Sequence, residues 1–262
     1  MKAMGNDLRV AILKEQFIPD HVFIYVAKGG FRVFDGEKNY IFKAGEACIA
    51  RKNRLAKYEL LDDEEEFEPI LFCFDEPFLK SRSKNHKLGQ NTFVSQDTFI
   101  QVSKSPLIES FIQSIKPYSR GLMQLDEVFE EVKYDELLLI LLTNQPELSE
   151  ILFDFGIPGK VNLEEFMNRN FKFNISISRF AYLTGRSLSA FKRDFKSIYG
   201  DTPSRWIVKR RLKEAYLLMD KQGKKPSDFY LDLGFESLSH FSTSFKKMYG
   251  QAPSGILKKQ SH

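Results

Sequence analysis

The sequence predicts an α+β protein: an antiparallel β domain, then helices, then an all-α C-terminal domain. Three observations predict this order. Over the first ~80 residues, short aromatic and β-branched runs alternate with turn residues. From about Ser105 the apolar residues recur at helical spacing. In the C-terminal half, two segments of 18 residues align with each other without a gap and are identical at ten positions.

Six runs in the N-terminal part have the length and composition of β-strands. Glycine pairs, an Asp-Gly pair and an acidic run separate them, as turns do. Short strands spaced this closely favour an antiparallel barrel or a jelly roll. The runs are 21–27, 31–35, 39–43, 47–51, 56–61 and 69–74.

Two helices are expected after the strands, over 105–116 and 126–143. Asp126 is suited to cap the second helix. Its aliphatic run, Leu137 to Leu142, makes the helix apolar on too many faces for a half-exposed position on a monomer. Burial against the strands and a dimer contact both explain this run, and the two explanations stay open.

A domain boundary is expected within 154–162, where two glycines and a proline follow the last apolar helix signal. The expected domains are therefore 1–155 and 158–262. Residues 158–262 hold 20 Lys+Arg and 9 Asp+Glu, a balance of +11, whereas the rest of the chain has a balance of −7. Such a basic half suggests a polyanionic partner; an unevenly charged soluble surface is the plainer alternative.

The repeated segment reads SLSAFKRDFKSIYGDTPS at 187–204 and SLSHFSTSFKKMYGQAPS at 237–254, with ten identical positions. Two copies are too few for a solenoid, so we expect one supersecondary unit used in duplicate. In the first copy, a helix over 177–184 should end at Gly185, which can take the left-handed conformation of a tight turn. Ser187 can then cap a second helix that runs to about Tyr199.

A helix, a tight glycine turn and a second helix with one apolar face form the helix-turn-helix pattern. The first motif spans 177–199, and the second spans 227–249 with Gly234 before its turn and Ser237 as its cap. The expected core residues of the two second helices are Leu188, Phe191, Phe195, Ile198, Leu238, Phe241, Phe245 and Met248.

A third helix, over 203–219, is expected to join the two motifs. Thr202 can cap it, and Pro203 suits its first turn. A helix of this length is about 25 Å long and could hold two recognition helices about 34 Å apart, which is one turn of DNA. Duplication would thus let one chain read two adjacent major-groove segments.

The predicted β-barrel raises the alternative that the protein is an enzyme, because such a barrel can hold a metal ion. That metal would need two or three histidines and a carboxylate. The N-terminal half has only His21 and His86, without an H-x-H, so no metal, cofactor or catalysis is expected. Cys48 and Cys73 lack metal-binding spacing and fit buried free thiols. A protein-interaction module without DNA affinity is a further alternative, which the duplicated motif disfavours.

No membrane segment is expected. The first ten residues lack the apolar core of a signal peptide. The longest aliphatic run has six residues, against the ~20 that span a bilayer. The expected location is cytoplasmic.

The C-terminal ~100 residues resemble the DNA-binding domain of the AraC/XylS family of bacterial transcription regulators. The first motif of that family, A-x-x-x-G-x-S, is matched by Ala181, Gly185 and Ser187. Its linker pattern, R-L-x-x-A, is matched by Arg211, Leu212 and Ala215. The second motif matches Gly234, Phe235, Ser237, Ser239, Phe241, Phe245 and Lys246, and the final G-x-x-P matches Gly250 and Pro253. The N-terminal half resembles, more weakly, the cupin-like sensing domain of ExsA-like members.

The residues off the core face of each second helix are the candidates for contact with base edges. They are Ser189, Ala190, Lys192 and Arg193 in the first motif and Ser239, His240, Ser242 and Thr243 in the second. Because arginine forks onto guanine and hydroxyls discriminate poorly, the first motif should read more sequence. His240 could equally be a plain exposed residue. The candidates for phosphate contact are Arg179, Arg186, Lys196, Lys209, Arg210, Lys246 and Lys247, although exposed basic residues often only solubilise.

The partners that this resemblance implies are double-stranded DNA at an operator or promoter and, for an activator, RNA polymerase. A homodimer through the N-terminal domain and a small-molecule or protein effector also follow from it. The choice between activation and repression stays open at this point.

Overall fold

The computed structural model describes residues 16–61, 67–84, 95–115, 117, 119–120, 124–125 and 127–258. The chain divides into two compact units, Met1–Gly156 and Ile157–His262. The division falls inside the segment 154–162, in which the sequence places a boundary.

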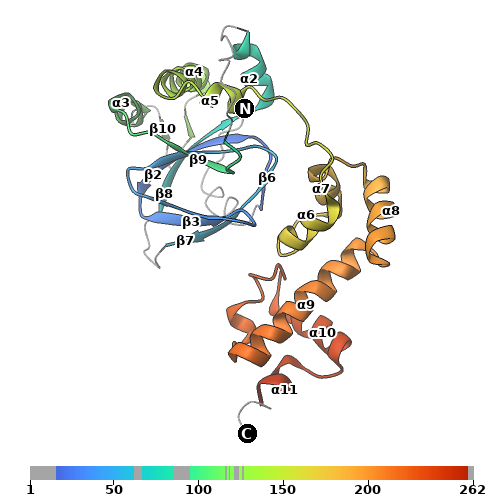
Figure 1. Cartoon of the computed structure of the whole chain (residues 1–262). Helices are drawn as coiled ribbons and strands as arrows, with labels where there is room; N and C mark the ends of the chain where they lie inside the picture. The colour runs from blue at the N-terminus through green and yellow to red at the C-terminus, as the bar shows by residue number, and fades with distance from the viewer. Residues whose placement is uncertain are drawn as a thin grey trace. The chain divides into compact units, whose positions relative to one another are not determined.

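Two antiparallel sheets make up most of the β structure of the first unit (Figure 1). The larger has the strand order β8-β2-β5-β9, and the smaller has the order β4-β3-β7. Their strands are β2 (His21–Lys28), β3 (Gly30–Phe34), β4 (Asn39–Lys43), β5 (Ala47–Ala50), β7 (Lys57–Leu60), β8 (Glu68–Phe74) and β9 (Phe99–Val102). Two short pairs are β1 (Phe17–Ile18) with β6 (Arg54–Leu55) and β10 (Ser119–Arg120) with β11 (Gln124–Leu125).

Each of the six predicted runs corresponds to one strand, namely β2, β3, β4, β5, β7 and β8. The α+β class and the order of β structure before helices are confirmed. Strand β9 was not predicted. It pairs with β5 from Ala47↔Val102 to Ala50↔Phe99 and forms an edge of the larger sheet.

Alternation along the strands gives the first unit two cores, because successive side chains point to opposite faces of a sheet. On β2, Phe23 lies opposite Ile49 and Phe72 and belongs to the core beneath the helices. Its neighbour Ile24 lies opposite Cys48 and belongs to the core between the two sheets.

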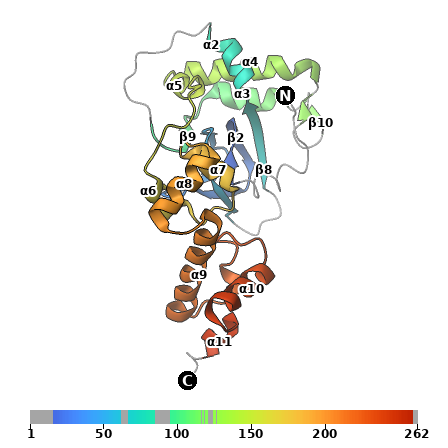
Figure 2. The same ribbon diagram turned by 90° about the vertical axis from the view of Figure 1, so that its right-hand side faces the viewer.

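Helices of the first unit pack on the larger sheet through the core that contains Phe23 (Figures 1 and 2). They are α2 (Glu76–Ser83), α3 (Pro106–Ile115), α4 (Glu127–Asn144) and α5 (Leu148–Leu152). Helices α3 and α4 match the predicted helices 105–116 and 126–143; the proposed cap Asp126 lies outside the described residues. The aliphatic run of α4 is divided between core and surface, since Leu137, Leu138 and Leu141 are buried and Leu139 is 55% exposed.

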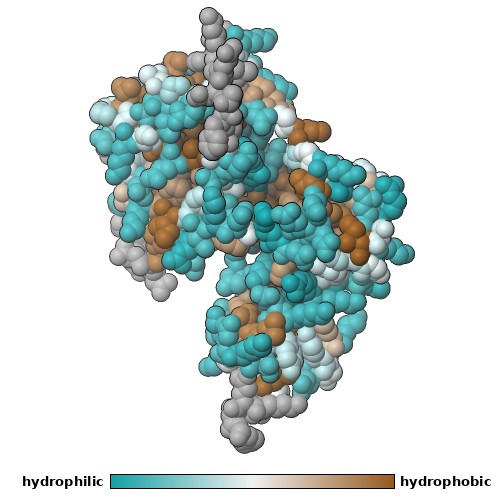
Figure 3. All heavy atoms as spheres, in the orientation of Figure 1, coloured by the Kyte–Doolittle hydropathy of each residue, from teal (hydrophilic) through white to brown (hydrophobic). Residues whose placement is uncertain are grey.

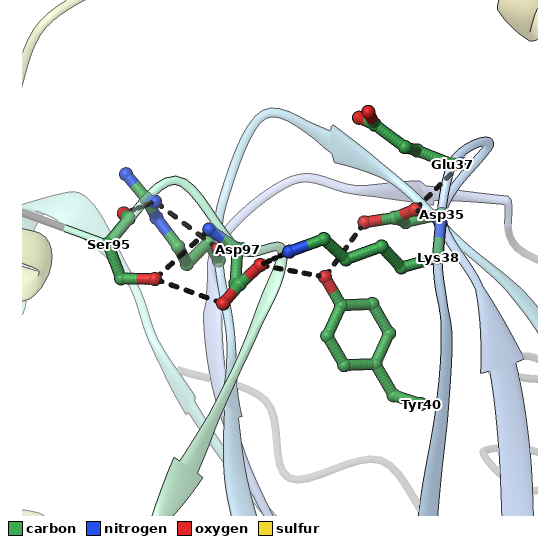
Figure 4. Close-up of polar contacts among 7 residues, drawn as sticks. Asp35, Glu37, Lys38, Tyr40, Ser95 and Asp97 are labelled. Atoms are coloured by element: carbon green, nitrogen blue, oxygen red, sulfur yellow. Dashed lines mark hydrogen bonds and ion pairs between the residues drawn. The ribbon is translucent and has the colours of Figure 1, made fainter.

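A polar network joins the β3–β4 turn to the residues that precede β9 (Figure 4). The Tyr40 hydroxyl donates to Asp35 Oδ2 at 3.0 Å and lies 3.4 Å from Asp97 Oδ1, while Lys38 pairs with Asp97. Arg51, which is buried, donates to the backbone carbonyls of Ser95 and Asp97. The network therefore holds the start of β9 in place.

One expectation for the cysteines is wrong. Cys48 is a buried free thiol, as predicted, whereas Cys73 is exposed. Cys73 alternates with buried Phe72 and Phe74 near the end of β8, so it points away from the core beneath the helices.

The second unit is all-helical, which confirms the predicted class of the C-terminal part (Figure 1). Its helices are α6 (Leu163–Asn170), α7 (Ile177–Leu183), α8 (Leu188–Tyr199), α9 (Pro203–Gln222), α10 (Leu238–Tyr249) and α11 (Pro253–Lys258), with a 3₁₀ turn η2 (Pro226–Asp228). One apolar core gathers α6, α7 and α8, and another gathers the turn segment Phe229–Phe235, α10 and α11. Helix α9 contributes Ile207 to the former and Leu212, Ala215 and Met219 to the latter.

The first element of the second motif differs from the expectation of a repeated helix. It is the 3₁₀ turn η2, and further turns follow up to Gly234. The Phe229 amide donates to the Pro226 carbonyl and the Leu233 amide to the Phe229 carbonyl, so the pattern of 3₁₀ and α-type bonds is mixed. The corresponding segment of the first motif, of comparable length, forms the helix α7, so the two motifs differ in their first element. Within the described parts of both units, no helix is long and apolar enough to cross a membrane.

Candidate nucleic-acid interface

The two recognition helices, α8 and α10, are built alike. Ser187 and Ser237 cap them, each through a side-chain oxygen that accepts from the amide three residues later. Gly200 and Gly250 end them in the left-handed conformation. The sequence repeat therefore encodes the start and the stop of both helices, and these caps confirm the prediction.

The aromatic packing behind the two helices is also duplicated. Ring centroids of Phe191 and Phe195 lie 5.6 Å apart, and those of Phe241 and Phe245 lie 5.7 Å apart. Each second phenylalanine then meets a tyrosine, Tyr199 or Tyr249, at 4.6 Å. Both helices thus lie on an equivalent aromatic base, which fixes their rotation.

The turn that leads into each helix needs glycine for space as well as for conformation. Gly185 has φ +65°, and an added Cβ would lie 2.4 Å from the backbone of Gly159. Gly234 has φ +85°, and an added Cβ would lie 2.4 Å from the carbonyl oxygen of Lys172. Any side chain at either position would push the turn away from its support.

The predicted core face is wrong at its ends. Leu188 is 40% exposed, Leu238 is 41% exposed and Ile198 is 47% exposed, whereas the central phenylalanines are fully buried. The small cores of this unit cover only the middle turns of α8 and α10. Periodicity correctly places these residues near the core side, but it does not show how far the supporting elements reach along the helix.

Six of the eight candidates for base contact are exposed, and Ala190 and Ser242 are half-buried. Arg193 has a side chain that is 78% exposed, with a weak contact of 3.4 Å to Asp194. Its counterpart Thr243 is exposed too. His240 lies edge-on to Phe235, at 5.7 Å between ring centroids, and remains open to solvent. The outward faces of α8 and α10 are therefore polar.

The candidates for phosphate contact differ in how exposed their side chains are. Lys196, Lys246 and Lys247 are exposed, and Lys209 is 60% exposed while it pairs with Asp201 at 2.6 Å. Arg179 is exposed as well, and Arg210 is half-buried with its guanidinium 5.2 Å from the Phe171 ring. Hydrophilic residues cover most of the face of this unit that Figure 3 shows.

Arg186 corrects the phosphate prediction. Its side chain is only 9% exposed and donates to the carbonyls of Val161 and Thr184 and to Asp194. These bonds hold the α7–α8 turn against the segment before α6. The hydrogen bond from Arg186 lowers the pKa of Asp194, with the charge of Arg193 in support. Arg186 therefore stabilises the first helix-turn-helix motif.

Sequence reasoning missed the role of Arg211, which it treated only as part of a linker pattern. Arg211 is 7% exposed, and its guanidinium donates to three backbone carbonyls. The available signal was its place in the R-L-x-x-A pattern, directly beside Leu212, which is buried.

No cluster of three or more metal-ligating side chains occurs in the described ranges. His21 is buried, and His86 lies outside those ranges. Aromatic side chains lie between the two sheets of the first unit: Phe31 lies 5.3 Å from Phe42, and Phe99 lies 6.0 Å from Tyr58, between ring centroids.

Comparison with known proteins supplies family matches to both units. Residues 21–151 match the model of the ExsA N-terminal regulatory domain, and residues 180–259 match that of a helix-turn-helix domain. The chain is 30% identical over 135 residues to the virulence regulon transcriptional activator VirF of Yersinia enterocolitica, which covers 51% of this chain and 49% of VirF. It is 30% identical over 108 residues to the HTH-type transcriptional regulator ExsA of Pseudomonas aeruginosa, which covers 40% of this chain and 39% of ExsA.

These matches span about half, or less, of the length of the curated relatives. Among solved structures, an apo ToxT variant from Vibrio cholerae is similar at a TM-score of 0.40 and 18% identity, over 94% of this chain and 91% of ToxT.

Two helix-turn-helix motifs on one basic unit, each with a solvent-facing polar recognition helix, define the class of AraC-type DNA-binding transcription regulators. The chain belongs to this family, and its regulatory domain is of the ExsA type, because the model of that domain matches half of the chain.

Proposed function

We propose that the whole chain binds a promoter through α8 and α10, placed in two successive segments of the major groove, and regulates transcription there. The duplicated recognition helix supports this proposal most strongly. Both copies keep the cap, the aromatic base and an outward polar face. Exposed lysines at the ends of both helices are suited to contact phosphates, which position a motif on the duplex without reading its sequence.

We further propose that the chain is an activator that contacts RNA polymerase. The support is its similarity to VirF, which is described as a transcriptional activator. A regulator of bacterial promoters would act in the cytoplasm, and in this proposal the chain carries out no catalysis.

The test begins with selection of duplexes by the full chain from a random pool. Affinity for the selected duplex should exceed that for a shuffled duplex by about 10³-fold or more at physiological salt. Both affinities should fall as salt rises, since neutralised phosphates release counterions. Absence of enrichment by a folded protein at low salt would overturn the proposal.

Transcription in vitro from a promoter that contains the selected duplex then tests the direction of regulation. More transcript with the protein than without it supports activation, and less transcript would show repression. A promoter with the shuffled duplex is the matched control.

We propose that residues 1–155 form a regulatory and dimerisation domain and that residues 158–262 form the DNA-binding domain. An apolar stripe on the outer face of α4 supports dimerisation: Val128 is 78% exposed, Val132 is 62% exposed and Leu139 is 55% exposed. These positions recur at helical spacing on one face. A second copy of the same helix would cover the stripe.

We propose that an effector of this domain is a protein that binds its outer surface. The aromatic rings of Phe31, Phe42, Tyr58 and Phe99 occupy the space between the two sheets, where a barrel would hold a small molecule. Capture of the chain from its native host would identify a stoichiometric protein partner. Val132 and Leu139 are left unaltered in this experiment, so that the proposed dimer contact is kept. Recovery of a bound small molecule by mass spectrometry instead would contradict this proposal.

A further inference from the structure

Arg211 lies near the middle of α9, the helix that joins the two motifs, and bonds to the segment that leads into the first motif and to the turn of the second. Its Nε donates to the carbonyl of Phe171 at 2.8 Å, and its Nη2 donates to the carbonyl of Phe173 at 2.8 Å. Its Nη1 donates to the carbonyl of Gly234 at 2.6 Å. Phe171 and Phe173 belong to the segment between α6 and α7, whereas Gly234 begins the turn into α10. One guanidinium thus connects the supports of both recognition helices.

The surrounding contacts make this junction close. An added Cβ at Gly234 would lie 2.4 Å from the Lys172 carbonyl oxygen, so the two backbones touch. Lys172 Nζ pairs with Glu214 of α9 at 2.9 Å, and Asn174 Nδ2 donates to Glu236 at 3.3 Å. The ion pair and the amide contact lie nearer to solvent, while Arg211 is buried. Arg211 is therefore the central bond of the junction.

The chemistry of arginine suits this role. A planar guanidinium presents donors in fixed, diverging directions, which lets one side chain reach three carbonyls in two segments. A lysine ammonium is a single point and cannot match all three directions. Burial lowers the pKa of Arg211 to about 10, and the charge of Glu236 opposes that shift. The side chain is therefore still protonated at neutral pH and keeps all its donors.

We propose that Arg211 is a positioning residue that sets the spacing and the rotational phase of the two DNA half-sites. The inference rests on the proposed function, in which α8 and α10 read adjacent groove segments. Helix α9 joins the motifs along the chain and packs into a separate apolar core on each side, so neither core by itself ties one motif to the other. With the Phe171–Phe173 segment and Gly234 tied to one guanidinium, the two recognition helices move as one body.

The test uses the full chain and the duplex that it selects from a random pool. Footprinting defines the two half-sites, and one base pair is then inserted or deleted between them, which shifts one half-site by about 3.4 Å and about 35°. The measured quantity is the ratio of the dissociation constant for the respaced duplex to that for the selected duplex. For the wild-type chain this ratio should be at least about tenfold, because one recognition helix loses its base contacts.

Arg211→Met should bring the ratio toward unity, mainly by weaker binding to the selected duplex, and should leave binding to the respaced duplex close to wild type. Arg211→Lys, which keeps the charge but not the fork, should give an intermediate ratio. Met219→Ala is the matched control: Met219 is a buried residue of α9 that does not bridge the motifs, so the variant should melt earlier and keep the wild-type ratio.

A wild-type ratio in every folded Arg211 variant would overturn the inference and leave Arg211 with a purely stabilising role. If Arg211→Met does not fold, the ratio for Arg211→Lys decides by the same criterion. A wild-type chain that selects a duplex yet tolerates respacing also overturns it. A wild-type chain that selects no duplex contradicts the proposed function itself, which distinguishes the two failures.

Discussion

At the scale of single residues, the two recognition helices share their caps and differ in what they present to DNA. Arg193 and Thr243 occupy the same position of the repeat, two residues before a buried phenylalanine. Arginine can donate to guanine O6 and N7 together, whereas threonine has one short hydroxyl. The asymmetry therefore concerns base recognition and leaves the structural base of each helix unchanged.

Arg193→Ala should cost about 1–3 kcal/mol of binding free energy and relax specificity at one base pair. Thr243→Ala should cost less, since one hydroxyl contact contributes about 1 kcal/mol net. The measurement is the affinity of each variant for a panel of single-base variants of the selected duplex at fixed salt. If Arg193→Ala weakens every duplex equally while Thr243→Ala removes discrimination at one position, the assignment of the two motifs is reversed.

The burial of His21 predicts that the stability of the first unit depends on pH. The residue is 2% exposed; its Nδ1 accepts from the Lys52 amide at 3.4 Å, and its Nε2 has no hydrogen-bond partner in the described residues. Burial, together with the charges of Lys52 and Arg51, lowers the pKa of His21 to about 3. In the unfolded chain this pKa would be about 6.5.

Below pH 6.5 the unfolded chain therefore binds a proton that the folded chain excludes. The free energy of unfolding should fall as pH drops from about 6.5 toward about 3, by up to ~1.4 kcal/mol per pH unit. Denaturant unfolding between pH 7 and pH 5 tests this above the range in which most carboxylates titrate. His21→Gln, which can still accept from the Lys52 amide, should give a flatter profile; an equal slope in both proteins would count against the cause given.

At the scale of elements, α4 serves the core and the surface at once. Leu138 is 1% exposed and belongs to the core between the helices and the larger sheet, while its neighbour Leu139 is 55% exposed on the outer stripe. The sequence left burial and dimer contact as alternatives for this helix. In the structure the two explanations concern different residues, because Leu138 is buried and Leu139 is exposed. Substitutions at these positions can therefore test them separately.

Leu139→Glu should convert a dimer into a folded monomer, because a carboxylate in a dimer contact would be buried without a partner. The measurement is sedimentation of wild type and variant at matched concentrations, with a melting curve for each. Leu217→Glu is the matched control, since Leu217 on α9 is an exposed leucine of similar accessibility, at 46%, in the other unit. A wild-type chain that sediments as a monomer at about 10⁻⁵ M, an affinity of about 7 kcal/mol, would argue against dimerisation.

The sequence predicted elements best where a local signal defines both of their ends. Helix α8 has a serine cap and a glycine stop within the repeat, and its bounds follow directly. Strand β9 has four residues and no turn of its own; it exists because β5 offers an unpaired edge, which local sequence does not reveal. The 3₁₀ turn η2 takes the place of a helix although its segment is about as long as that of α7, so segment length alone does not distinguish the two.

The sequence likewise predicted only part of the candidate interface. Helical spacing identified the outward residues, yet Arg186 was indistinguishable from an exposed arginine until its carbonyl partners were known. Arg211 bonds to segments about 40 and 23 residues away along the chain. Contacts of that range depend on how the motifs pack, so no local pattern contains them.

At the scale of the whole molecule, charge and core both divide at the same point. The unit from Ile157 onward has its own two apolar cores and carries the positive balance of +11 counted over 158–262. The first unit has separate cores and a negative balance. An independent core is what a fragment needs in order to fold alone, and a basic surface is what it needs to bind a polyanion.

A fragment of residues 157–262 should therefore fold and bind duplex DNA without the first unit. The logarithm of its affinity should fall linearly with the logarithm of salt concentration, by about 0.9 for each phosphate that it neutralises. Lys196→Ala should reduce this slope by about one unit, because Lys196 is exposed. Arg186→Ala is the informative comparison: its guanidinium is committed to Val161, Thr184 and Asp194, so the variant should melt earlier with the slope unchanged. A smaller slope in Arg186→Ala would show that this arginine does meet a phosphate, and a folded fragment that ignores DNA at low salt would show that the first unit is required for binding.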